Sequence, residues 1–430
     1  MDFQNVNPLN VRLNIISGNL LPITSDGSSF HITWRIYTII IWIIELFQTC
    51  ATICGFVLVA NRETLQNAGT VSIVLSIEVF ILLTRMYASK DLASQLIQKL
   101  NSVMHSGDET MKNIVHSTLK PLEIPLEFYC IAGTGSVIVW CSMPLILIFK
   151  KKSFFYEDFG MMAAFSKQPF STKVFVLGNL IETVASAYIF LKKVALNVYM
   201  INLVLLLTAQ YRYIAIKLAA IFHYNTSQNE GHEFQKENYS QATQCDTVII
   251  LFSFNINKQQ GRNDSLCYTV SSMSLAGKHH ITTLILKKFL SFNMSLIYLN
   301  NIFLFCFVDI VFINAVYSQK RTHERTYFLS LWNMGSVLIV YLCGALIQLY
   351  ILCFCVHQLL EASKELTDKA FHEKWYQFGP SLKHIFRMIM VSNNLKTKLS
   401  ISEKFNLSLP SFLAILNQSY SIAILLLKVK

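Results

Sequence analysis

Charged residues are scarce in this chain of 430 residues, where Asp, Glu, Lys and Arg together make up only 14%. An average soluble domain is about 25% charged. Glycine and proline are also few, at 15 and 8 residues, which excludes collagen-like and low-complexity chains. The 53% of apolar residues excludes an intrinsically disordered chain. We therefore expect a polytopic membrane protein.

Motifs that carry enzyme or metal chemistry are missing as well. Most of the ten cysteines lie inside apolar runs, where a thiol packs as a small hydrophobic group. No histidine set completes a zinc spacing, and no nucleophile–base pair or phosphate-binding loop is present. The first 30 residues lack the basic start and short apolar core of a signal peptide. The sequence predicts no enzyme, no metal site and no cofactor.

Long apolar runs are what the chain does contain. A bilayer core of about 30 Å needs roughly 20 apolar residues per helix. Runs of this kind predict an all-α protein with seven transmembrane helices. The expected helices are 36–59, 66–86, 127–149 and 174–207 within 36–207, then 297–317 and 331–356 within 297–356, and 406–427 within the final segment 406–430.

The fourth run is longer than a bilayer requires and contains Lys192 and Lys193. Because no turn residue separates its halves, we expect one long helix that extends beyond the bilayer. The lysine pair is then expected near a membrane interface, where long side chains reach water.

The segments between the spans are more polar. We expect residues 1–35 to form a cytoplasmic N-terminal segment, and residues 91–104 an amphipathic helix with its apolar side chains on one face. The segment 208–296 is expected to be a cytoplasmic loop. Its atypical part, about 245–288, is either a disordered insertion or an artefact of gene prediction. Residues 357–405 are expected to form cytoplasmic anchor helices.

Basic residues orient the chain. If the N-terminus is cytoplasmic, roughly two thirds of the 36 Lys and Arg residues fall on the cytoplasmic side, as the positive-inside rule requires. The C-terminus is then extracellular. A G-protein-coupled receptor has the opposite orientation, and its acidic-Arg-Tyr triplet and terminal Asn-Pro kink are missing here. That class nevertheless stays open as the alternative function.

Four acidic residues lie inside the expected spans. These residues are Glu45, Glu78, Glu182 and Asp309. A charge there costs about 2.5–3.5 kcal/mol on insertion scales, so each is expected to face protein or water. Glu45 and Glu182 either border a path for cations or serve as partners for hydrogen bonds between helices.

Spaced residues near the C-terminus form a specific pattern. Cys353 is followed by Ser363, Ala370, Phe371 and Trp375. The pattern continues through Leu407–Phe412, Ile415, Leu416 and Ser419–Ser421. In this order and spacing the residues resemble the C-terminal region of the insect odorant receptor family, with Phe371 where the family usually has Tyr. The sister gustatory receptors are the second choice, because their terminal-span signature is absent.

The resemblance implies a subunit of an odorant-gated, non-selective cation channel. Such a subunit works in the plasma membrane of a sensory neuron dendrite, beside a shared coreceptor subunit in a tetrameric assembly. Its ligand is a volatile small molecule. The resemblance also implies that Ser363, Phe371 and Trp375 belong to the cytoplasmic anchor between subunits.

The last helix lines the pore in this family, and its gate positions correspond to Leu425, Lys428 and Val429 here. On periodicity alone, Leu425 is equally well explained by packing against lipid or another helix. Lys428 departs from the neutral polar group that the family commonly has. Since four ammonium groups in a ring would repel cations, we expect this subunit to contribute only one or two copies beside a coreceptor.

A pocket for a volatile ligand should be apolar and aromatic. In the third expected span, Gly133, Ser136 and Trp140 recur at helical spacing, so that small residues leave room beside an indole wall. Family pockets use this part of the span. Val79, Phe80 and Tyr188 are further candidates, although large side chains in such positions often serve only to pack helices together.

Overall fold

The computed structural model describes residues 2–24, 30–58, 68–106, 108–160, 163–228, 282, 285–307, 325–372, 400–402, 405–406 and 409–428. This part of the chain is almost entirely helical. One antiparallel hairpin interrupts it, formed by β1 (Ser400–Ser402) and β2 (Phe405–Asn406). The expectation of an all-α membrane protein is confirmed apart from this hairpin. Three residues named in the sequence analysis, Asp309, Trp375 and Val429, lie outside the described residues.

Two short helices, α1 (Phe3–Val6) and α2 (Pro8–Ile16), begin the chain. The Asn7 side chain caps α2 by accepting a hydrogen bond from the Asn10 amide at 3.2 Å. Pro8 takes a first-turn position, where the amide hydrogen that proline lacks is not needed. After α2 the chain turns at Gly18, whose φ of +73° favours glycine.

The next helices are α3 (Ile32–Leu58), α4 (Ala68–Ala88) and α5 (Lys90–Ser106). The apolar run of α4 and the helix that follows it are bent by 66° relative to one another. Helix α5 confirms the helix expected at 91–104. Its apolar side is buried, as shown by Leu96, Ile97, Leu100 and Met104.

Helix α6 (Glu109–Ser142) starts at Asp108, whose carboxylate accepts a hydrogen bond from the Met111 amide at 3.2 Å. It begins well before the span expected at 127–149, and the last part of that span is a 3₁₀ helix, Met143–Phe149. A short 3₁₀ helix, Tyr156–Asp158, follows in a small aromatic core in which Phe154 and Phe175 stack at 4.1 Å between ring centroids.

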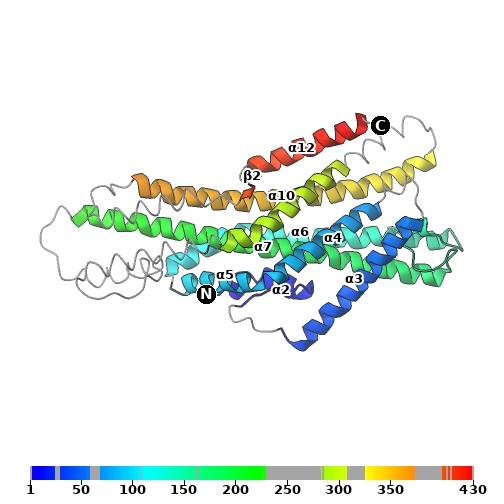
Figure 1. The fold of residues 1–430 in the computed structure, drawn as a ribbon, viewed down its shortest axis with the longest axis horizontal. Helices are drawn as coiled ribbons and strands as arrows, with labels where there is room; N and C mark the ends of the chain where they lie inside the picture. Colours follow the sequence, from blue (N-terminus) through cyan, green and yellow to red (C-terminus); the bar gives the residue numbers. More distant parts are fainter. Residues whose placement is uncertain are drawn as a thin grey trace.

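Helix α7 (Thr172–Gln228) is unbroken and runs along the long axis of the molecule (Figure 1). The interpretation as one long helix is therefore confirmed, and residues 208–228 are helical rather than loop. Every residue from Lys192 to Tyr211 is buried. A helix buried on all sides is a core element, and α7 packs against α2, α3, α4, α6 and α10.

Three further helices complete the described chain: Ile285–Phe307, α10 (Arg325–His372) and α12 (Leu409–Lys428). Helix α12 lies beside α10 (Figure 1). It buries Ile415, Ser419 and Ala423, which recur every four residues and so form one face. Leu413, Tyr420 and Leu425 remain exposed.

Five of the described helices are long and apolar enough to cross a membrane, or six if the bent pair of α4 and α5 counts as one span. The apolar part of α12, Leu409–Leu425, is shorter than the others. The count of seven stays a prediction. The five helical stretches are Ile32–Leu58, Glu109–Phe149, Thr172–Ile216, Ile285–Phe307 and Leu342–Lys369.

The turn after α2 depends on Asn14, which is 1% exposed. Its amide donates to the Leu21 carbonyl and its carbonyl accepts from the Leu21 amide, each at 2.9 Å. Replacing Asn14 by Ala leaves two buried backbone groups unpaired, so we expect a loss of about 1–3 kcal/mol in stability. The melting temperature of the detergent-solubilised protein measures this. The exposed Asn5, changed to Ala, is the control, and equal melting of the two variants would contradict the expectation.

Candidate functional site

The α6 residues expected to line a ligand pocket are all partly exposed. Gly133 lies against the ring of Phe190 on α7, because a Cβ at position 133 would be only 2.4 Å from that ring. The Ser136 hydroxyl donates to the Ala132 carbonyl of its own helix at 2.7 Å. Trp140 lies at the end of α6, where its carbonyl accepts a hydrogen bond from the Met143 amide.

The candidates on α4 differ from one another. Val79 is 2% exposed and Phe80 is 53% exposed. The Phe80 ring packs edge-on against Trp42 of α3, with ring centroids 6.0 Å apart. Val79 therefore belongs to the packed interior, while Phe80 lies at the surface of the bundle.

Tyr188 on α7 contacts Tyr37 of α3. Its hydroxyl lies 3.0 Å from that of Tyr37, and the two rings meet edge to face at 6.3 Å. The Tyr37 hydroxyl also lies 2.8 Å from the Ile16 carbonyl. Three of the six candidates, Gly133, Phe80 and Tyr188, thus contact three different aromatic residues, namely Phe190, Trp42 and Tyr37. The contacts described for the six candidates do not join them into the wall of one pocket.

One group of residues near Gly133 was missed by the sequence analysis. The Tyr129 ring lies 6.0 Å from that of Phe190, and the Tyr129 hydroxyl donates to Gln348 Oε1 of α10 at 3.0 Å. We call Gly133, Tyr129, Phe190 and Gln348 the Tyr129 cluster. It joins α6, α7 and α10, and its signal in the sequence was a single amide, Gln348, inside an apolar run.

The amide nitrogen of Gln348 makes the Tyr129 cluster chemically distinctive. Gln348 is 5% exposed, and Nε2 has no hydrogen-bond partner within the described parts of the chain. An unpaired buried donor costs free energy. A ligand oxygen placed here would accept that hydrogen bond while aromatic rings enclose its apolar part.

Two glutamate–lysine pairs lie in the interior of the bundle. Lys192 Nζ lies 2.6 Å from Glu45 Oε2 of α3, and Lys193 Nζ lies 2.9 Å from Glu78 Oε2 of α4. All four side chains are almost completely buried. The lysine side chains therefore do not reach water as expected, and their position near a membrane interface stays a prediction. Because neighbouring residues on a helix point in different directions, one lysine reaches α3 and the other α4.

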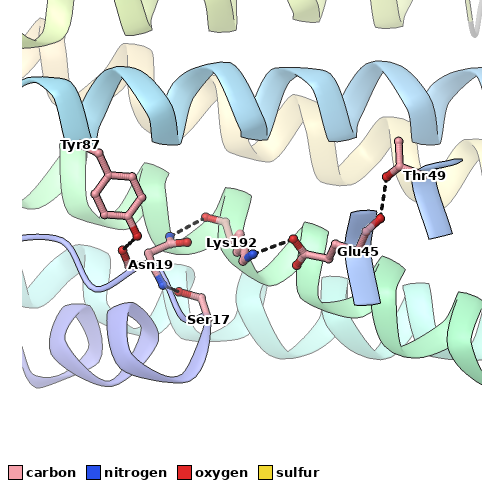
Figure 2. Close-up of polar contacts among 6 residues, drawn as sticks. All are labelled: Ser17, Asn19, Glu45, Thr49, Tyr87 and Lys192. Carbon is pink, nitrogen blue, oxygen red and sulfur yellow. Dashed lines mark hydrogen bonds and ion pairs between the residues drawn. The ribbon is translucent and has the colours of Figure 1, made fainter. Parts of the chain in front are cut away.

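The N-terminal segment is attached beside the first pair (Figure 2). Asn19 Nδ2 donates to the backbone carbonyl of Lys192 at 3.1 Å, and Tyr87 of α4 donates to the Asn19 carbonyl. The Lys192 ammonium also lies 3.6 Å from the centre of the Trp42 ring, a cation–π contact. Glu45 was expected either to border a path for cations or to form hydrogen bonds between helices, and the structure supports the second interpretation.

Glu182 is 0% exposed and lies among buried groups as well. Its carboxylate approaches Gly160, where an added Cβ would be 3.0 Å from Oε1. The adjacent Asn179 donates to the Cys141 carbonyl of α6 at 3.0 Å. Both the Glu45 and Glu182 side chains thus face protein.

The expected gate and anchor residues are only partly described. Leu425 is 63% exposed on α12, and Lys428 is the last residue of that helix. In α10, Ser363 is 2% exposed and its carbonyl accepts a hydrogen bond from Thr367, whereas Phe371 is 63% exposed. Ser363 is thus buried and Phe371 exposed, and their role as anchor residues stays a prediction.

Comparison with known proteins supports the resemblance found in the C-terminal residues. The family model described as 7tm Odorant receptor matches residues 325–420. Odorant receptor 63a of Drosophila melanogaster is 25% identical over 120 residues, a stretch that spans 26% of this chain and only 29% of that relative. These matches cover part of the chain and agree with its resemblance to the insect odorant receptor family.

Solved structures resemble the whole chain. The insect olfactory receptor OR5 from Machilis hrabei in complex with eugenol matches with a TM-score of 0.67 and 13% identity, covering 100% of both chains. The same receptor without that ligand matches with a TM-score of 0.68 and 12% identity, covering 98% of this chain and 97% of the other. At such low identity the likeness shows a shared fold.

The Glu45–Lys192 pair generates a test of stability. Changing Lys192 to Met leaves a buried carboxylate without its partner, and we expect a loss of about 3–5 kcal/mol. Changing Glu45 to Gln in the same chain removes both charges and should recover most of that loss. The melting temperature of each solubilised variant, monitored by size-exclusion chromatography, measures the change in stability. If the double variant melts no higher than the single one, the pair is not what holds α3 to α7.

Proposed function

Because part of the chain matches the insect odorant receptor family, we propose that it is a member of this family and an odorant-binding subunit of a ligand-gated, non-selective cation channel. The shared coreceptor supplies the other subunits. The observation that carries the proposal is the likeness over the full chain to an olfactory receptor solved with a volatile phenol, eugenol. The C-terminal match to the odorant receptor family model supports it.

We place the odorant at the Tyr129 cluster and extend the site toward Ser136 and Trp140 on the same helix. Phe190 fills the space that the missing side chain of Gly133 leaves. Volatile ligands offer mainly shape and dispersion, for which rings and small residues are suited. The unpaired Gln348 amide supplies one directional contact.

In this proposal seven helices cross the plasma membrane, with the N-terminus in the cytoplasm and the C-terminus outside. The exposed Leu413 and Leu425 of α12 face the pore or a neighbouring subunit. Lys428 at the end of that helix favours a mixed assembly, since a ring of four ammonium groups would repel cations.

The direct experiment is expression with and without the insect coreceptor, recording membrane current during a panel of volatile phenols, esters, ketones, alcohols and hydrocarbons. We expect an odorant-evoked cation current only when the coreceptor is present, because the neutral coreceptor subunits dilute the Lys428 charges. Epitope tags on intact cells give an independent check, with the C-terminal tag accessible from outside. A robust current from the chain alone would contradict the mixed assembly.

Replacing Gln348 by Leu tests the position of the ligand. We expect the half-maximal concentration of an activating ester, ketone or phenol to rise about fivefold or more, since the variant loses a hydrogen bond worth about 1 kcal/mol or more. Activation by a hydrocarbon should change little. Ile347→Val, at an exposed neighbour on the same helix, is the control. Equal shifts for hydrocarbons and oxygenated odorants would remove Gln348 from the site.

A further inference from the structure

Glu78 joins three helices. Its Oε2 accepts hydrogen bonds from Lys193 Nζ of α7 at 2.9 Å and from Asn300 Nδ2 at 2.6 Å. Asn300 belongs to the helix Ile285–Phe307. Glu78 is 3% exposed and Lys193 is 4% exposed, so water does not compete for these bonds. The carboxylate therefore fixes α4 simultaneously to α7 and to the helix Ile285–Phe307.

The contact between α4 and the helix Ile285–Phe307 extends beyond Glu78. The Arg85 guanidinium lies 5.0 Å from the centre of the Phe292 ring, and Asn293 Nδ2 lies 3.3 Å from the sulfur of Met86. As the numbers on α4 rise, those of the partner helix fall, so the two helices run antiparallel. Contacts at both ends of this shared stretch keep them in register.

The opposite side of the helix Ile285–Phe307 contacts α12. The Tyr298 hydroxyl donates to Gln418 Oε1 at 3.0 Å, and the Cys306 thiol donates to the Ser419 carbonyl at 3.2 Å. Tyr298 and Asn300 are two residues apart, which places them roughly 160° apart, on nearly opposite sides of an α-helix. One helix thus holds α4 with one face and α12 with the other.

We propose that Asn300 and Tyr298 are positioning residues that couple odorant binding to the pore. Phe190 of the Tyr129 cluster lies three residues before Lys193 on α7, so a displacement of α7 at the ligand site moves the bond between Lys193 and Glu78. The bond to Asn300 passes that displacement to the helix Ile285–Phe307, and the Tyr298–Gln418 bond passes it to α12. The inference rests on the proposed function, because it requires that α12 lines an odorant-gated pore.

The test uses the full chain coexpressed with the coreceptor and the panel odorant that evokes the largest wild-type current. Asn300→Leu removes the donor while keeping a similar volume, and Asn300→Gln retains a donor amide. Ser295→Ala is the control, since Ser295 donates only within its own helix, to the Ser291 carbonyl at 2.9 Å. Surface biotinylation gives the amount delivered to the membrane.

For equal surface amounts, we expect Asn300→Leu to raise the half-maximal odorant concentration about fivefold or more, a change typical of coupling between two sites. We also expect a change in the fraction of the current that flows without odorant. Asn300→Gln should lie closer to the wild type, and Ser295→Ala should match it. A purely structural role would lower the surface amount and leave both readouts unchanged.

Tyr298→Phe tests the opposite face of the same helix if Asn300→Leu reaches the membrane poorly, since it deletes one hydroxyl and keeps the ring. The same shift in half-maximal concentration supports the coupling. If the wild type responds normally and both variants keep the wild-type half-maximal concentration and odorant-free current, the proposed coupling is overturned. The proposed function would then still stand. Absence of any odorant-evoked current from the wild type with its coreceptor overturns the proposed function itself.

Discussion

Two glutamate–lysine pairs in the described interior of this bundle must neutralise each other's charges. An isolated charge inside a membrane-spanning helix is costly, and a buried pair is tolerated only with close contact. Lys192 and Lys193 satisfy this condition by reaching glutamates on two different helices, α3 and α4. The rotation of α7 about its axis and its position along that axis are therefore fixed relative to α3 and α4. Any other arrangement would leave a buried charge without its partner.

Other parts of the molecule are arranged around these pairs. The N-terminal segment is bound to the Lys192 backbone through Asn19, and Tyr87 of α4 holds the same residue (Figure 2). Glu78 carries the connection onward to the helix Ile285–Phe307 and so to α12. The Tyr129 cluster joins α7 to α6 and α10 through aromatic rings, a glycine and an amide rather than through charges.

Local patterns in the sequence were sufficient to predict several helices, but not which helices and side chains contact one another. Hydropathy and spacing predicted α5 and a single long α7, because both depend on residues close together in the chain. The burial of the lysine pair was not predicted, since Glu45 and Glu78, which bind the two ammonium groups, lie far from them in sequence. Gly133 was found from its small size, but Phe190 and Gln348 required three-dimensional packing. The family came from spaced C-terminal residues.

The most direct measurement compares charge exchanges within and between the pairs. Glu45→Lys with Lys192→Glu exchanges the members of one observed pair, whereas Glu45→Lys with Lys193→Glu exchanges residues that are not partners. The readout is the amount of protein at the cell surface and its melting temperature after solubilisation. Specific pairing predicts that the first variant retains much of the wild-type value and the second loses it. Equal loss in both would contradict the assignment of these pairs as the constraint that sets the bundle.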